Sequence, residues 1–272
     1  MSVSSPLKWH GGKFYLASKL WELAKSIPHI HRVEVYGGSC AFTLATDPEG
    51  ASEVINDANG ELMNFWRCLK DRKKFAELVR TLEATPFSEA EWQRASAGGE
   101  AVDGLVEDAA AFFVTCRQSL AGRMDAFAPL SRTRVRRGMN EQASAWLSAV
   151  EGLPQVHARL KRVAVLNRKA LDVIRSQDGE GTLFYLDPPY LPETRKTVGG
   201  YGAHEMTREQ HEELLVAISN IAGSFLLSGY ASDLYLDHAQ RNGWERVDFE
   251  LPNNSASGKA KRRMTECVWV KR

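Results

Sequence analysis

The sequence lacks the features that mark several broad classes of protein. Its 272 residues include only four cysteines, Cys40, Cys68, Cys116 and Cys267, and no two of them form a C-x-x-C pair. Neither a zinc site nor a disulfide framework is therefore expected. No stretch approaches the roughly 18 apolar residues of a membrane helix, and the N-terminus has no apolar run of a signal peptide. We expect a cytoplasmic protein with no bound metal and no membrane contact.

A net charge of one sign is also missing. The chain has 35 basic and 34 acidic residues, a balance of +1 that argues against a general polyanion binder. The average conceals a segregation, because residues 117–169 hold eleven Lys or Arg against three acidic residues. Such asymmetry is expected where one face meets phosphates, and on charge alone a solvated face explains it equally well.

The pattern of apolar residues predicts an α/β fold. Hydrophobic residues make up 43% of the chain, which is enough to exclude disorder and to build a sizeable core. Nearly continuous apolar runs are typical of parallel strands covered by helices on both faces. We predict seven strands, of which the last two pair antiparallel around the polar loop 252–264, at residues 32–36, 52–56, 163–167, 182–187, 224–228, 245–251 and 265–270.

Helical periodicity occupies most of the remaining chain. A capping box is expected at Thr207 and Gln210. The predicted helices cover residues 13–26, 59–69, 73–83, 88–96, 106–120, 142–150, 155–162, 169–176, 208–222 and 232–241. More than 100 residues separate the second strand from the third, too many for a simple connection. We therefore predict one domain from residues 1–70 and 160–272 and an inserted, mostly helical, basic domain from residues 71–159.

The strongest chemical signal is Asp187-Pro188-Pro189-Tyr190, directly at the end of a predicted strand. Ligands of open α/β sheets bind beyond the carboxyl ends of the strands. The Asp187 carboxylate and the Pro188 carbonyl are acceptors that suit an exocyclic amino group, and the Tyr190 ring suits stacking on a planar base. The tetrapeptide therefore favours a site for an amino-bearing ring.

Two weaker signals point to a nucleoside. A predicted strand runs into the glycine-rich turn Tyr36-Gly37-Gly38-Ser39, where a ligand can approach the backbone. Asp57 follows about 20 residues later, the spacing at which an acid in α/β units holds ribose hydroxyls. Neither G-x-G-x-x-G nor G-x-x-x-x-G-K-[ST] is present, which argues against a dinucleotide or a nucleoside triphosphate.

The order of these motifs resembles the DNA adenine methyltransferase family. LKWHGGK at residues 7–13 is followed by EVYGGS at 34–39, INDAN at 55–59, a basic insertion and DPPY at 187–190. The resemblance implies a Rossmann-like fold, S-adenosylmethionine (SAM) as methyl donor, and the N6 amino group of adenine in double-stranded DNA as acceptor. It also implies a bacterial or phage-encoded protein, a monomer or weak dimer, with a possible cognate restriction endonuclease.

The resemblance assigns roles to individual residues. The predicted catalytic residues are Asp187, Pro188, Pro189 and Tyr190. The predicted cofactor-binding residues are Trp9, Gly12, Lys13, Tyr36, Gly37, Gly38, Ser39, Asp57, Asp172 and Asp187, although Asp172 suits an ordinary surface acid equally well. The predicted DNA-binding residues are Lys8, Arg117, Arg123, Arg132, Arg134, Arg136 and Arg137.

The sequence departs from the family in two places. The family turn normally reads F-x-G-x-G, whereas Tyr36 replaces the Phe and Cys40 stands at the last Gly. Cys is small enough to be compatible with donor binding, and a Cβ at a tight cofactor contact would weaken it, so the sequence leaves the effect of Cys40 open. Residues 116–123 occupy the place of a segment that reads N-R-x-G-[FY]-N-G-L in GATC-specific relatives, and they lack its Asn-Gly pair and its aromatic residue. Recognition of GATC is therefore not supported.

The expected reaction is one direct displacement on a base flipped out of the duplex. The Tyr190 ring would stack on that base, so that its hydroxyl is expected to matter little. Three alternatives remain open from the sequence: methylation of cytosine N4, methylation of RNA or of a protein glutamine, and a DNA-binding protein whose cofactor pocket has decayed.

Overall fold

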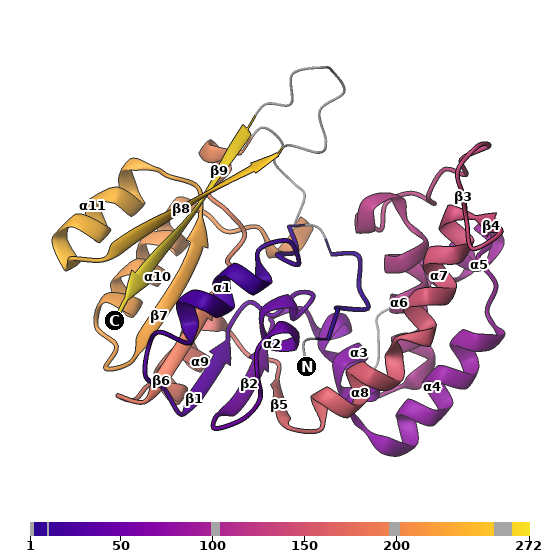
Figure 1. Cartoon of the computed structure of the whole chain (residues 1–272), viewed down its shortest axis with the longest axis horizontal. Helices are drawn as coiled ribbons and strands as arrows, with labels where there is room; N and C mark the ends of the chain where they lie inside the picture. The colour runs from indigo at the N-terminus through magenta and orange to yellow at the C-terminus, as the bar shows by residue number, and fades with distance from the viewer. Residues whose placement is uncertain (1–2, 10, 99–103, 196–201, 253–262) are drawn as a thin grey trace.

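A seven-stranded sheet forms the centre of the computed structural model, which describes residues 3–9, 11–98, 104–195, 202–252 and 263–272 (Figure 1). Strands β7 and β9 and strands β8 and β9 pair antiparallel, and the other neighbours pair parallel. The predicted fold class is confirmed. The order across the sheet is β5 (Val163–Leu166), β2 (Ser52–Asn56), β1 (His31–Glu34), β6 (Thr182–Leu186), β7 (Ser224–Gly229), β9 (Arg263–Lys271) and β8 (Glu245–Pro252). The predicted loop between the last two strands lies outside the described residues at 253–262.

The strand order reverses at β1. This strand pairs with β2 on one side and with β6 on the other, so that Glu34 lies beside both Ile55 and Tyr185. The connections leave β1 and β6 toward opposite edges of the sheet, which opens a crevice beyond their carboxyl ends. The glycine-rich turn after β1 and Asp187 after β6 therefore meet at one place.

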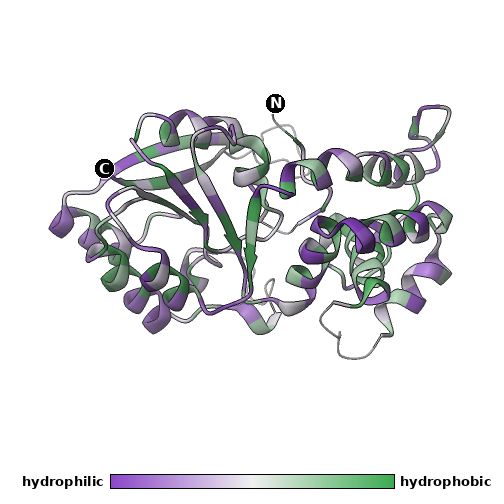
Figure 2. Cartoon of the chain, turned by 90° about the horizontal axis from the view of Figure 1, so that it is seen from below, coloured by the Kyte–Doolittle hydropathy of each residue, from purple (hydrophilic) through white to green (hydrophobic). Residues whose placement is uncertain are grey.

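Helices cover both faces of the sheet. Helices α1 (Ala17–Ala24) and α2 (Ala41–Ala45) pack on one face, with Leu20 and Phe42 against Leu183 and Tyr185. Helices α9 (Ala170–Gln177), α10 (Arg208–Ser219) and α11 (Asp233–Asn242) cover the other face. Figure 2 shows the strands between them as mostly hydrophobic. The Thr207–Gln210 capping box is present. Among the described residues, no helix has the length and hydrophobicity to cross a membrane.

The segment between β2 and β5 is helical, as expected. It holds α3 (Gly60–Lys70), α4 (Arg72–Ala84), α5 (Glu89–Ser96), α6 (Val106–Gln118), α7 (Glu141–Glu151) and α8 (Leu153–Leu160). Its core is continuous with α3, because Phe65 and Trp66 join the same apolar cluster as Phe113 and Trp146. The rings of Phe65 and Phe113 stack at 5.3 Å. Two strands of two residues each, β3 (Val135–Arg136) and β4 (Met139–Asn140), were not expected, since so short a pair has no periodicity.

The N-terminal segment that precedes α1 is held against the end of α6 and the turn that follows it. The Cys116 thiol donates to the Lys8 carbonyl oxygen at 3.0 Å. Gly122 in the 3-10 turn η1 (Leu120–Gly122) has φ of +73°, and a Cβ there would lie 1.9 Å from the same oxygen. Only glycine fits this contact. The end of α6 and η1 therefore fix the segment that leads to Trp9 and Lys13.

Candidate active site

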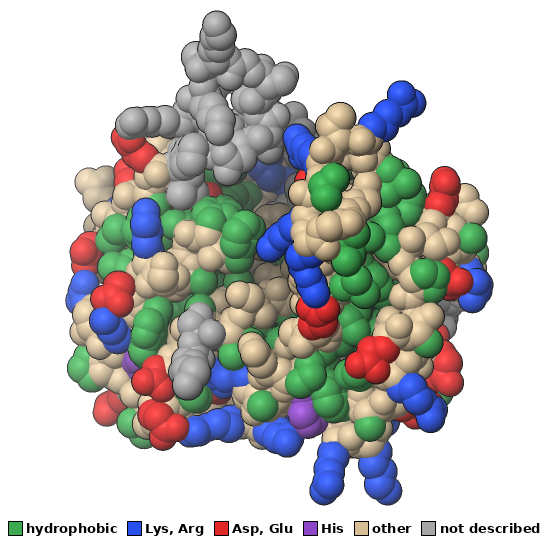
Figure 3. Space-filling view, turned by 45° about the vertical axis from the view of Figure 1, so that its right-hand side comes forward, with side chains coloured by type: hydrophobic (Ala, Val, Ile, Leu, Met, Phe, Trp, Pro, Cys, Tyr) green, Lys and Arg blue, Asp and Glu red, His purple; other side chains and the backbone are tan. Residues whose placement is uncertain are grey.

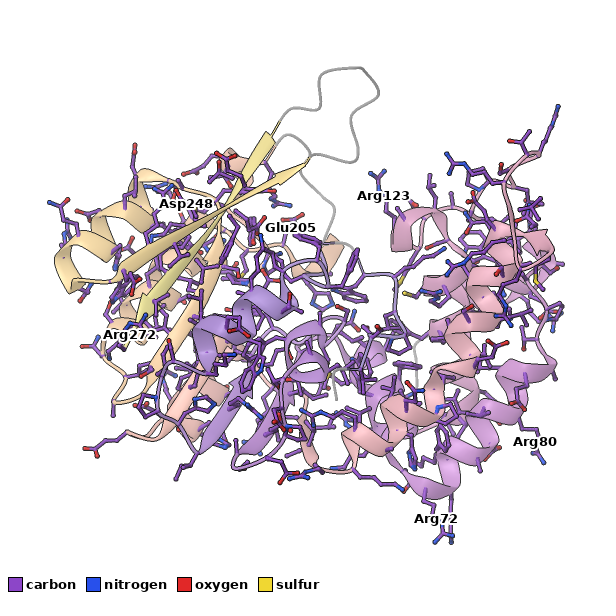
Figure 4. All side chains as sticks on the ribbon, viewed as in Figure 1. Arg72, Arg80, Arg123, Glu205, Asp248 and Arg272 are labelled. Atoms are coloured by element: carbon purple, nitrogen blue, oxygen red, sulfur yellow. The ribbon has the colours of Figure 1, made fainter. Side chains whose placement is uncertain are left out.

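A cavity of about 950 Å³ lies beyond the carboxyl ends of β1 and β6. Residues from the N-terminal segment, the turn after β1, the ends of β2 and β6, α9, α10 and residues 202–206 line it. Arg123, on the side of the helical segment, and Glu205, on the side of the sheet, both line it (Figure 4). The structure brings together in its wall all ten residues predicted for cofactor binding: Trp9, Gly12, Lys13, Tyr36, Gly37, Gly38, Ser39, Asp57, Asp172 and Asp187.

The turn after β1 has no room for side chains. A Cβ on Gly37 would lie 2.9 Å from the Asn56 carbonyl oxygen. The same oxygen accepts the Gly37 N–H at 2.7 Å, and this hydrogen bond holds the turn. Gly38 has φ of +47°, and a Cβ there would lie 2.7 Å from Trp9 Nε1. The Trp9 ring therefore stands directly against the bare turn, and together they form one wall of the cavity.

Cys40 adopts φ of +52°, a left-handed conformation that glycine normally favours. Its side chain is fully buried in the core cluster that contains Leu44 and Trp66, and it does not line the cavity. The Cys40 side chain therefore does not stand where a tight cofactor contact would be made. The family glycine at this position is explained by the backbone conformation, and the thiol points away from the ligand space.

The Asp57 carboxylate is fixed at the cavity wall. Its Oδ2 accepts the Gly38 N–H and its Oδ1 accepts the Asn59 N–H, each at 3.0 Å. Burial raises the pKa of Asp57, and the two hydrogen bonds work in the opposite direction. Asp172, by contrast, is exposed at the rim, with Oδ1 3.6 Å from Arg175 Nη1. Asp57 thus joins the turn after β1 to the helix that follows β2.

Asp187 forms a buried ion pair with Lys13. Lys13 Nζ lies 3.0 Å from Asp187 Oδ1 and donates to the Gly11 carbonyl oxygen at 2.8 Å. Burial alone would lower the pKa of Lys13, but the charges of Asp187 and Glu266 raise it above its ordinary value. Burial raises the pKa of Asp187, which Lys13 opposes. Lys13, which the sequence predicts as a cofactor-binding residue, thus also pairs with the predicted catalytic carboxylate.

Tyr190 differs from expectation in one respect. Its ring is 5% exposed, lies 4.7 Å below Lys13 Nζ and meets the Tyr230 ring edge-on at 4.8 Å. Its hydroxyl donates to Glu266 Oε1. The sequence indicates that the hydroxyl matters little, whereas the structure gives it a buried carboxylate as a partner, and removing it would take one donor from Glu266 Oε1. Pro189 lines the cavity beside Asp187, and Pro188 is buried behind it.

Two carboxylates of the site were missed by the sequence. Glu34, at the end of β1, lines the cavity and accepts the Thr43 N–H at 2.9 Å. Burial raises its pKa to about 7, and the charge of Asp187 adds to the effect. Glu266 on β9 is 3% exposed. Glu34 stands between Val33 and Val35, and Glu266 directly precedes the buried run Cys267–Val270. An acid beside buried apolar residues is the signal that could have identified them.

The basic residues divide into exposed and inward-facing groups. Arg123, Arg132 and Arg136 are exposed, and in the described part of the chain no ion pair involves the last two. Several Lys and Arg side chains border a hollow on the face shown in Figure 3. Arg134 pairs with Glu141 at 3.4 Å, and Arg137 binds both oxygens of Glu151 at 2.9 Å.

Two basic residues lie deeper than expected. The Arg117 guanidinium faces inward, donates to the Ala145 carbonyl oxygen at 2.7 Å and is mostly buried. Arg117 is therefore withdrawn from the predicted DNA contacts. Lys8 is half-buried and donates to Gln142 Oε1 at 3.2 Å. Burial, followed by the charge of Arg117, lowers the pKa of Lys8 to about 8.

The comparison with protein families agrees with this geometry. No curated protein shows significant sequence similarity to the chain. The family model described as D12 class N6 adenine-specific DNA methyltransferase matches residues 9–96 and 139–248. The matched segments include the turn after β1, Asp57 and Asp187, and they leave out residues 97–138 and the last strand. Because the match covers more than half of the sequence, the chain belongs to the D12 class of N6 adenine-specific DNA methyltransferases.

Proposed function

We propose that this adenine-N6 methyltransferase uses SAM as its methyl donor and acts at specific sites in double-stranded DNA on an adenine flipped out of the duplex. The observation that carries the proposal is the meeting of the bare Gly37–Gly38 turn with the Lys13–Asp187 pair in one cavity. One part of the cavity suits a nucleoside and the other an amino group.

The residues present fit SAM. Gly37 and Gly38 present bare backbone to the cavity, and Trp9 provides an apolar surface beside it. Asp57 would accept the ribose hydroxyls, and Asp172 at the rim would reach the adenine of the donor. When bound, SAM supplies an electrophilic methyl group on a positively charged sulfur.

The chain's own contribution is to orient the target nitrogen. The N6 lone pair of adenine is delocalised into the ring, so N6 is a poor nucleophile. Hydrogen bonds from N6–H to the Asp187 carboxylate and the Pro188 carbonyl would hold the amino group and direct its lone pair. Lys13, 3.0 Å from Asp187, favours the ionised form of that carboxylate against the effect of burial. After transfer, N6 has one proton too many, and Asp187 is the carboxylate placed to accept it.

DNA would approach from the side of the cavity that bears Arg123. This arginine is exposed at the opening, and the β3–β4 hairpin presents Arg132 and Arg136 beyond it. Exposed guanidinium groups are suited to phosphates and to guanine edges. Residues 71–159 would then serve as the recognition domain, and residues 1–70 and 160–272 as the catalytic domain.

Mass spectrometry of nucleosides from treated duplex DNA tests this proposal. The wild-type protein with SAM should yield N6-methyladenine and no N4-methylcytosine. Asp187→Asn should abolish the product and leave the SAM dissociation constant, measured by calorimetry, within about threefold, since Asp187 faces the acceptor. Asp248→Asn, which removes an exposed acid of β8, is the matched control and should behave like wild type. An active Asp187→Asn variant, or a wild type that does not bind SAM, would refute the proposal.

A further inference from the structure

Glu266 is a buried acid for which the fold gives no reason. It lies in the middle of β9, opposite Phe249 of β8, between Thr265 and the apolar run Cys267–Val270. It is 3% exposed and lies beyond residue 248, where the family match ends. Burying a carboxylate costs several kcal/mol in the absence of compensation, and an apolar residue would suit this strand better. Its contacts therefore deserve a functional explanation.

The contacts of Glu266 all lead to the predicted catalytic residues. Its Oε1 accepts the Tyr190 hydroxyl and lies 3.6 Å from Lys13 Nζ. The same ammonium lies 3.0 Å from Asp187 Oδ1. Two buried carboxylates therefore share one ammonium. Because each opposite charge competes for Lys13, the hold of Lys13 on Asp187 depends on the charge of Glu266.

We infer that Glu266 is a positioning residue of methyl transfer: it shares the Lys13 ammonium with Asp187 and anchors the Tyr190 hydroxyl, so that Asp187 remains free to accept a hydrogen bond from the target amino group. This inference rests on the proposed function. Without the Glu266 charge, Lys13 would interact with Asp187 alone and would reduce its strength as an acceptor. Glu266 touches neither substrate in this scheme and acts through its neighbours.

The other titratable groups around the cluster are accounted for. Burial raises the pKa values of the neighbouring phenols, which keeps them neutral at ordinary pH: Tyr15, Tyr185, Tyr190 and Tyr230. Glu34 titrates near the same site, since burial raises its pKa to about 7. The effect of Glu266 on the pH profile is therefore taken as the difference between proteins that all contain Glu34, so that the titration of Glu34 is common to them.

The test compares the single-turnover methylation rate at saturating SAM across pH for wild type, Glu266→Gln, Glu266→Asp and Glu245→Gln. Glu245 is an exposed acid of the neighbouring strand and serves as control. Glu266→Gln should lower the rate about 10- to 100-fold, the range for groups that orient a reacting residue, with the KM for SAM within about threefold. The acid limb, the part of the pH–rate profile where the rate falls at low pH, should move to lower pH. The reason is that the pKa of Asp187 falls when a neighbouring negative charge is lost.

Glu266→Asp is the conservative variant. It restores the charge but is one methylene shorter, so the acid limb should return toward its wild-type position while the rate stays below that of wild type. Thermal melts report the folded fraction of each variant. A Glu266→Gln rate that falls only in proportion to the folded fraction, or an unmoved acid limb, would overturn the inference. If the glutamine variant does not fold, a Glu266→Asp variant with the full wild-type rate would overturn it instead. A wild type that makes no N6-methyladenine would refute the proposed function itself.

Discussion

The raised pKa of Glu34 predicts how the free energy of unfolding changes with pH. Burial at the end of β1 raises the pKa of this carboxyl from 4.5 to about 7. Between these two values the folded chain keeps a proton that the unfolded chain has released, so stability falls as pH rises through this window. Each pKa unit corresponds to about 1.4 kcal/mol, which makes the loss about 3 kcal/mol, complete above pH 7. Glu34→Gln should remove that loss.

Urea unfolding at pH 5 and at pH 8, without SAM, checks this value. At each pH, the free energy of unfolding of wild type is subtracted from that of Glu34→Gln. This difference should be about 3 kcal/mol larger at pH 8 than at pH 5. His211 acts in the opposite direction, because burial lowers its pKa to about 4, and its effect cancels in the difference between the two proteins. Glu245→Gln, at an exposed position, should show no such difference. Equal pH dependence in wild type and Glu34→Gln would refute the reasoning.

Three further predictions follow from the site and the hairpin. Asp57→Ala should raise the KM for SAM about 10- to 100-fold with unchanged DNA affinity, because it removes a charged acceptor; normal donor binding with easier unfolding would show that Asp57 only holds the turn. Arg136→Ala should weaken binding to all duplexes and lower the salt slope of log K by about one, as measured by fluorescence anisotropy, whereas Arg137→Ala should change little, because Arg137 is already paired with Glu151. Gly38→Ala should raise the KM for SAM and destabilise the fold by about 1–2 kcal/mol, since its φ is +47° and its Cβ meets Trp9; unchanged kinetics and melting would contradict this.

The strands and the antiparallel pairing of the last two could be read from the sequence because the local signals agree. Each central strand is a short apolar run, and Asp187 directly follows one of them. Its place beyond the carboxyl end of that strand therefore needed no information on packing. The glycine-rich turn was equally readable, since Gly37 and Gly38 mark a turn without side chains. The direction of the Cys40 side chain could not be read, because the sequence does not say that the left-handed conformation turns it away from the cavity.

Contacts between distant segments could not be predicted in the same way. Lys13 reaches Asp187 and Glu266 only after three separate segments have been placed around the sheet. Arg117 was counted as a DNA contact because a charge count does not distinguish the faces of α6, a helix that is buried on most sides. The β3–β4 hairpin was missed because two residues do not make a pattern.

The contact of Gly122 with Lys8 constrains how DNA specificity could be exchanged between relatives. Residues 97–138, which the family model does not match, would be the natural segment to transplant. Yet this segment holds Cys116 and Gly122, both of which touch the Lys8 carbonyl just before Trp9. A transplanted segment with any side chain at position 122 would displace the N-terminal segment that carries Trp9 and Lys13. Such a chimera would lose methyl transfer even when its DNA binding is intact, so the recognition segment and the N-terminal motif must be exchanged as one unit.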